Sequence, residues 1–110
     1  MTLAELATLI SGGGHVEVEV HAIDPMIYVA YLVSGERRHP LTERGRRARR
    51  FPSRYAAMRA LAQTGLPEAV FVHRSPYGEM IGLEGNADEN EMRERVPLQT
   101  EALRSLQQRR

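Results

Sequence analysis

A strict alternation of apolar and polar residues near the start of the chain constrains its fold more than any other feature. Two interleaved rows run through this stretch: Val16, Val18, Val20 and Ala22 in one, and His15, Glu17, Glu19 and His21 in the other. Successive side chains of a β-strand point to opposite faces of a sheet. The pattern therefore predicts a strand from His15 to Ile23 with one buried and one solvated face.

The segment that follows is apolar at almost every position. It runs from Met26 to Val33 and reads MIYVAYLV, which predicts a central strand with apolar side chains on both faces. Asp24 and Pro25 are typical turn residues. The two segments are therefore predicted to pair as an antiparallel hairpin.

Helices are predicted on both sides of further short strands. Thr2 and Glu5 have the spacing of a capping box, so a first helix is expected to begin there. Ser53 is expected to cap a second helix that ends at Gln63. The remaining strands are predicted over 38–42, 47–51, 69–73 and 79–83, with 47–51 as an exposed edge.

The predicted fold class is α+β, an antiparallel β-meander with two helices packed on one face. The element order is α-β-β-β-(β)-α-β-β plus a C-terminal tail. Residues 1–98 are expected to form a single domain. Residues 99–110 are expected to form a polar tail, with a helix capped by Thr100 as one alternative.

The expected core follows from these periodicities and consists of Leu3, Leu6, Ile10, Val16, Val18, Val20, Ile27, Val29, Tyr31, Val33, Leu41, Met58, Leu61, Val70 and Val72. Met26, Tyr28 and Leu32 would then lie on the other face of the sheet. An exposed apolar patch of this kind marks a surface for a protein partner or a homodimer. Tyr77, Glu79 and Met80 complete this candidate interaction surface.

The amino-acid composition excludes several kinds of chemical site. The 110 residues include no cysteine, which removes disulfides, thiolate metal sites and a cysteine nucleophile. The longest apolar run is far shorter than the ~20 residues that span a bilayer, and the first residues do not resemble a signal peptide. We therefore expect a soluble cytoplasmic protein without membrane association and without a cofactor.

The positive charges are concentrated in the middle of the chain. Residues 36–59 hold nine arginines and two glutamates, a sum of +7, although the whole chain has a net charge of +1. Candidate residues for binding nucleic acid or another polyanion are Arg46, Arg47, Arg49, Arg50 and Arg54. Strand alternation separates Arg47 and Arg49 from Arg46 and Arg50. The favoured interpretation is a solvated hairpin edge; the alternatives are nucleic acid, an acidic protein partner, or the acidic segment 84–94 of the chain itself.

Two further groups of polar residues have side chains that occur in metal or catalytic sites. The row of His15, Glu17, Glu19 and His21 contains metal-ligating types, but a site would need more ligands, for example His39 or His73. The segment 73–82 combines His, Ser, Tyr and Glu without an oxyanion hole or a carboxylate pair. We predict no catalytic residue and no metal ligand, and a small enzyme or metal binder remains the second alternative.

Two resemblances bear on the fold. The order helix, three strands, helix, with Arg49, Arg50 and Arg54 near the second helix, is similar over about the first 65 residues to double-stranded RNA-binding domains. That family's helix opens with a lysine-rich motif ahead of an alanine-rich run, and only the alanines 56, 57, 60 and 62 match here. The resemblance implies basic residues that meet phosphates across a groove.

The second resemblance covers nearly the whole chain except the tail. It rests on two groups of positions, His39, Pro40, Leu41, Gly45 and Ser53, followed by Tyr77, Glu79, Met80 and Gly82. These positions look like a small family of uncharacterised bacterial proteins without an established activity. The resemblance implies a fold and a bacterial origin, and it marks the element at 77–82 as the first to probe. The resulting expectation is a small non-enzymatic binding or regulatory protein that acts through a sheet surface and the arginine-rich hairpin.

Overall fold

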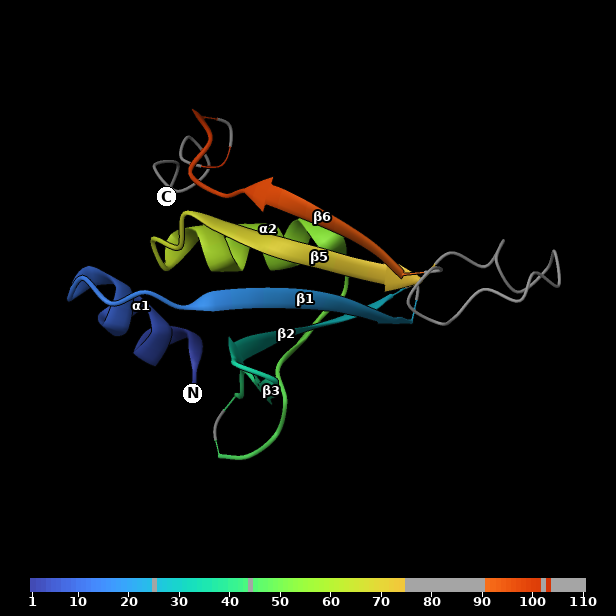
Figure 1. Ribbon diagram of the computed structural model, residues 1–110, viewed down its shortest axis with the longest axis horizontal. Helices are drawn as coiled ribbons and strands as arrows, with labels where there is room; N and C mark the ends of the chain where they lie inside the picture. The colour runs from blue at the N-terminus through green and yellow to red at the C-terminus, as the bar shows by residue number, and fades with distance from the viewer. Residues whose placement is uncertain (25, 44, 75–90, 102, 104–110) are drawn as a thin grey trace, which may run out of the picture.

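The computed structural model describes residues 1–24, 26–43, 45–74, 91–101 and 103 (Figure 1). Two helices and a six-stranded sheet make up the described part of the chain. In chain order they are α1 (Leu3–Ser11), β1 (Glu17–Asp24), β2 (Ile27–Ser34), β3 (Arg37–Pro40), β4 (Arg50–Phe51), α2 (Arg54–Gln63), β5 (Glu68–Arg74) and β6 (Glu91–Pro97). The predicted α+β class is confirmed.

The sheet is mixed. Its strands follow the order β3-β2-β1-β5-β6, and β4 pairs with β2 beside β3. The meander from β1 to β3 is antiparallel as predicted, whereas β5 runs parallel to β1. This parallel pair is possible because α2 and its connections carry the chain back across the sheet before β5 begins.

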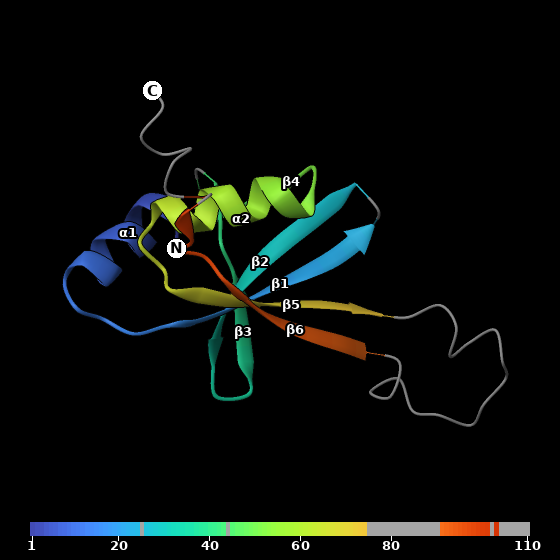
Figure 2. The ribbon, with the colours of Figure 1, turned by 90° about the horizontal axis from the view of Figure 1, so that it is seen from above.

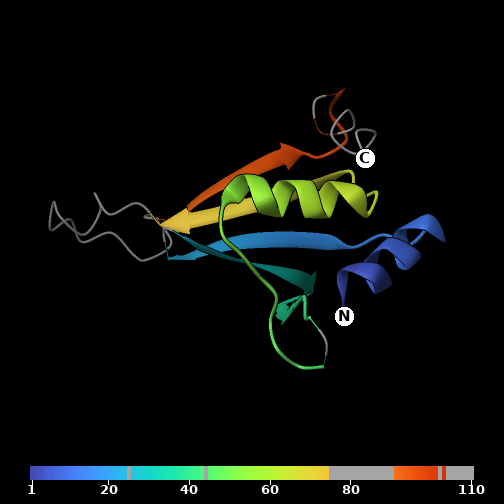
Figure 3. The same ribbon diagram turned by 180° about the vertical axis from the view of Figure 1, so that it is seen from behind.

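Both helices lie on the same side of the sheet, as Figure 2 shows, and α2 runs in roughly the same direction as β1 and β5 in the view of Figure 3. The capping box of α1 is formed: the Glu5 amide donates to Thr2 Oγ1 over 3.2 Å, and the Thr2 amide donates to Glu5 Oε1 over 3.0 Å. The Ala56 amide donates to Ser53 Oγ over 3.0 Å and so caps α2. Both predicted helix starts are thereby confirmed.

The main core lies between the helices and the sheet. Leu6, Val18, Val20, Leu41 and Leu61 are buried there, as predicted. Burying one such side chain contributes about 1.5–3 kcal/mol. The core also includes Leu98 and Leu103, so packed residues continue past residue 98. The Leu103 amide donates to Thr100 Oγ1 over 3.3 Å, as expected of a cap at Thr100.

The prediction of which face each β2 side chain occupies is wrong. Val18 pairs with Leu32 and Val20 with Ala30, so Leu32 and Tyr28 pack toward the helices. Val29, Tyr31 and Val33 lie on the opposite face, here called the open face, and so do Val70 and Val72 of β5.

A β-bulge causes this reversal. Asp24 pairs with Ile27, but Ala22 pairs with Tyr28, so the register shifts by one residue around Ile23. A shift of one residue moves every side chain of a strand to the other face. Without the bulge, Val20 would oppose Tyr31, and the predicted core row would be correct.

The partner of β5 is also different from the strand that the sequence suggested. β6 pairs with β5 from Glu68–Pro97 to Arg74–Glu91. The strand predicted at 79–83 lies outside the described residues. The interaction-surface residues Tyr77, Glu79 and Met80 lie outside them as well.

Candidate functional site

The open face carries a cluster of charged side chains around Glu19. This residue lies in the middle of β1 and is only 2% exposed. Arg38 of β3 donates from Nε to Glu19 Oε1 over 2.8 Å and from a terminal nitrogen to Oε2 over 3.1 Å. Arg93 of β6 donates to Oε2 over 3.1 Å. Three strands are thus joined through one carboxylate.

The same carboxylate orients a histidine. His21 Nε2 lies 2.9 Å from Glu19 Oε1, and its ring packs edge-on against Tyr31 with centroids 5.0 Å apart. The hydrogen bonds from Arg38 are the main cause that lowers the pKa of Glu19 from 4.5 to about 2, with smaller contributions from His21 and Arg93. Burial acts in the opposite direction and is outweighed. Glu19 therefore stays ionised and holds its arginines at neutral pH.

Sequence reasoning placed Glu19 on a solvated strand face and did not single out Arg38 or Arg93. The signal that could have found the cluster was the position of Glu19 in the middle of a central strand, where a carboxylate needs partners. The register that brings Arg38 and Arg93 to it depends on strands distant in sequence.

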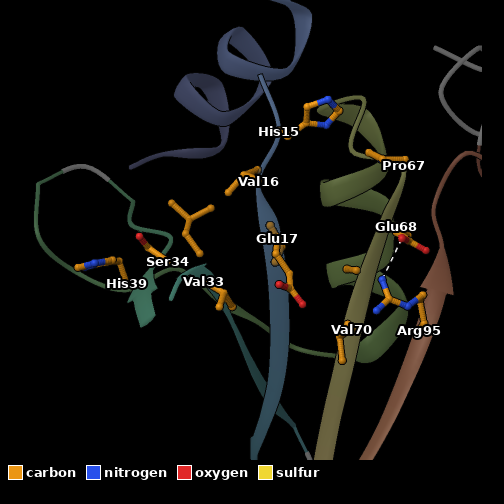
Figure 4. Close-up of a pocket in the computed structure, with 13 residues that line it drawn as sticks. His15, Val16, Glu17, Val33, Ser34, His39, Pro67, Glu68, Val70 and Arg95 are labelled. Atoms are coloured by element: carbon orange, nitrogen blue, oxygen red, sulfur yellow. Dashed lines mark hydrogen bonds and ion pairs between the residues drawn. The ribbon is translucent and has the colours of Figure 1, made fainter. Parts of the chain in front are cut away.

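The structure does not bring the histidines together as metal ligands. In the described part of the chain, no group of three or more His, Cys, Asp or Glu side chains is placed to hold a metal ion. Figure 4 shows His15 and His39 on separate walls of an open hollow where β1 and β5 begin. On the β5–β6 side of this hollow, Arg95 donates to Glu68 Oε1 over 2.9 Å.

The arginine segment, defined as residues 43–54, connects the end of the β3 region to α2. Arg46, Arg47 and Arg50 are exposed, and none of them has an ion pair with any described residue. Arg50 pairs with Val29 in the sheet and therefore lies on the open face. The predicted separation of these side chains by alternation is consistent with this placement.

Arg49 is partly buried on the other side. Its guanidinium lies 5.5 Å from the centre of the Phe51 ring, and Phe51 itself is buried in the core. The Nε atom of Arg49 is buried and has no hydrogen-bond partner among the described residues. Arg49 therefore belongs to the helix side of the segment, with Arg47 beside it in a second hollow.

Arg54 is already engaged within the chain. It begins α2, forms an ion pair with Glu94 of β6 over 2.8 Å, and its guanidinium lies 4.8 Å from the centre of the Phe71 ring. The chain's own acidic segment 84–94 was one of the expected partners of the arginines. Glu94 of that segment is the partner of Arg54.

The interaction-surface residues of β2 are separated by the register. Met26 is 69% exposed next to the hairpin turn. Tyr28 and Leu32 pack against the main core on the helix-covered face. They do not form one patch on the open face with Met26.

Comparison with known proteins bears on the second resemblance. Residues 1–103 match the model of a "Family of unknown function (DUF6482)". The chain belongs to this family. The expectation of a small uncharacterised family is thereby confirmed, and the likeness to double-stranded RNA-binding domains stays a topological expectation. No curated protein and no solved structure matches the chain.

Membership in this family assigns no activity. Among the described residues, no helix combines the length and the apolar character that crossing a membrane requires.

Proposed function

We propose that this chain is a small non-enzymatic binding protein that engages an acidic protein segment through its arginine segment. One contrast supports the proposal most strongly. Arg38, Arg54, Arg93 and Arg95 each bind a carboxylate of the chain, whereas the exposed Arg46, Arg47 and Arg50 bind none among the described residues. The second group has its charge available for a partner.

The choice of an acidic protein over nucleic acid rests on the number and surroundings of these arginines. Affinity for a duplex comes mostly from neutralised phosphates, each of which adds about −0.9 to the log–log salt slope. Of the five candidate arginines, Arg54 is held by Glu94, and Arg49 is partly buried against Phe51. The remaining three arginines fit a short run of carboxylates better than a long phosphate backbone. We further propose a cytoplasmic setting, which rests on the sequence expectation alone.

The sheet surface takes no part in the proposed binding. Arg38 and Arg93 on the open face already surround Glu19, and Val29, Val70 and Val72 of that face are buried. These contacts favour a structural role for the part of the open face around Glu19, away from Arg50 at its edge.

A binding assay with a Glu-rich peptide tests the proposal. Fluorescence anisotropy of a labelled peptide would be compared for the natural chain, the double variant Arg46→Gln/Arg50→Gln, and the control Arg59→Gln. Arg59 is exposed on α2, outside the arginine segment. We expect saturable binding that the double variant weakens about fivefold, since two exposed ion pairs at about 0.5 kcal/mol each sum to about 1 kcal/mol. The control should bind like the natural chain.

Two outcomes would overturn the proposal. One is a natural chain that does not bind the peptide, or a double variant that binds it equally well. The other is a short nucleic-acid duplex that binds more tightly than the peptide and loses affinity steeply with salt. That second result would favour the nucleic-acid alternative.

A further inference from the structure

The open face carries one negative and one positive charge that no described residue neutralises. Glu17 of β1 and Arg50 of β4 are both exposed, and neither forms an ion pair within the described part of the chain. By contrast, Glu19 and Glu68 of the same face are each bound by an arginine. The face therefore presents an unpaired carboxylate and an unpaired guanidinium to solvent.

The sheet register places these two charges symmetrically about one residue. Arg50 is opposite Val29 on β2, and Val29 is opposite His21 on β1. Because His21 comes four residues after Glu17, Arg50 lies about 13 Å farther along the strands and about 10 Å to the side, two strands away. Tyr31 of β2 lies half-way between the two charges in both directions.

The surface between the two charges suits contact with a second sheet. Tyr31 and Val33 are half-buried there, so part of each apolar side chain still meets solvent. Beside them, the Glu19 carboxylate holds Arg38 and Arg93 in place. Sheets that pack face to face lie about 10 Å apart, which long side chains of both faces can bridge.

The free edge of the sheet is less suited to association between copies. β6 ends the described sheet on one side and carries Arg93, Glu94 and Arg95 in succession. In an antiparallel pair of two copies of β6, the residue on the two-fold axis faces its own copy. Any of these three residues would then meet a like charge, which destabilises a cross-strand pair.

We propose that the open face packs against the open face of a second copy of this chain, around a two-fold axis that passes at Tyr31. The axis lies between the two sheets and exchanges the positions of the two unpaired charges. Glu17 then meets Arg50 of the second copy, and Arg50 meets Glu17 of the second copy. One patch that is complementary to itself is what a two-fold dimer requires.

This dimer goes beyond the proposed function and overlaps with it at one residue. Arg50 also belongs to the arginine segment, so an acidic protein segment and Glu17 of the second copy compete for its guanidinium. Arg46 and Arg47 take no part in the two-fold contact. A test of the dimer needs no peptide, so its outcome is independent of the outcome of the peptide assay.

A charge exchange between two variants tests the dimer. Sedimentation velocity at low salt and at several concentrations would be measured for Glu17→Arg, for Arg50→Glu and for their equimolar mixture. In either variant alone, both contacts of the dimer bring like charges together. In the mixture, each contact again joins an arginine to a glutamate, because one chain carries two arginines at these positions and the other two glutamates.

We expect the natural chain to pass from monomer to dimer as its concentration rises. Each variant alone should dimerise at least tenfold more weakly, and the mixture should regain the natural affinity. Glu17→Gln and Arg50→Gln introduce no new charge and give a second reading if a reversed charge disturbs the fold. Each should weaken the dimer about fivefold, because two exposed ion pairs are lost.

Glu36→Arg and Arg59→Glu are the matched controls, since both residues are exposed and lie outside the open face. Each control variant alone should dimerise like the natural chain. The proposal is overturned if the natural chain remains a monomer at every concentration. It is also overturned if the two variants dimerise alone like the natural chain, or if their mixture associates no better than either variant.

Discussion

The open face and the arginine segment both carry arginines, but they use them differently. On the open face Arg38 and Arg93 converge on one buried carboxylate, Glu19, and connect strands that are far apart in sequence. In the arginine segment Arg46, Arg47 and Arg50 point outward without an ion pair to any described residue. The same residue type thus stabilises the fold in one place and leaves charge at the surface in the other.

The difference shows that an arginine stabilises the fold where it meets a buried carboxylate, and leaves its charge at the surface where it meets none. A buried carboxylate must be paired, because an isolated charge in the interior costs several kcal/mol. An exposed arginine costs little when it stays solvated. Arg54 stands between the two cases, since it is the last residue of the arginine segment but binds Glu94 of β6.

Removal of the central carboxylate should have the largest effect. We expect Glu19→Ala to lower the free energy of unfolding by about 3 kcal/mol, because Arg38 and Arg93 lose their common partner. This value is at the low end for buried pairs because the two arginine side chains are 37% and 47% exposed. Urea unfolding at neutral pH measures it. Glu17→Ala, at an exposed position on the same face, should cost less than about 0.5 kcal/mol; equal losses would contradict the structural role of Glu19.

The pH dependence of the free energy of unfolding should report the ionisation of the same carboxylate, Glu19. The pKa of Glu19 is lowered from 4.5 to about 2 in the folded chain. A lowered folded-state pKa gives stability that is complete above the unfolded value and is lost as the pH falls through the folded value. The advantage of the natural chain over Glu19→Gln should therefore shrink by about 2 kcal/mol between pH 4.5 and pH 2. Urea unfolding of both proteins across this range measures it, and a constant difference would argue against the assignment.

Release of Arg54 from Glu94 should raise the affinity of the arginine segment for the Glu-rich peptide. Glu94→Gln removes the carboxylate that binds Arg54, so the guanidinium gains freedom to meet a partner. We expect the affinity for the Glu-rich peptide to rise about twofold, the equivalent of a surface ion pair. The same anisotropy titration measures it. Glu68→Gln, which releases Arg95 at a distance from the segment, serves as the control; an equal rise in both variants would indicate a general charge effect.

The smallest effect is expected where arginines have no partner to lose. Arg46→Gln/Arg50→Gln should change the free energy of unfolding by less than about 0.5 kcal/mol, because both side chains are exposed. Urea unfolding of the double variant measures this change. A loss similar to that of Glu19→Ala would mean that the segment stabilises the fold, and the contrast between the two regions would disappear.

Much of the fold could be predicted from local patterns. The capping residues Thr2 and Ser53 gave both helix starts, and the alternation in β1 gave the strand and its buried valines. These features depend on neighbours in sequence, which a single sequence displays. The antiparallel meander followed from short connections between strands.

The faces of β2 could not be predicted because both of its faces are apolar. Either register then buries a row of hydrophobic side chains, and only the bulge around Ile23 decides between the two. The pairing of β5 with β1 and β6 depends on contacts between distant segments, which no local pattern records. In the same way, the alternation of the arginine segment was visible in the sequence, but the partners of Arg38 and Arg54 were not.

The contrast between the two regions is tested most directly by a titration in which the side-chain Nε–H signals of all arginines are followed while the Glu-rich peptide is added. We expect saturable shifts at Arg46, Arg47 and Arg50, and unchanged signals at Arg38 and Arg93, which remain on Glu19. Shifts that are largest at Arg38 and Arg93, with Arg46 and Arg50 unmoved, would contradict the assignment of binding to the arginine segment and of structure to the open face.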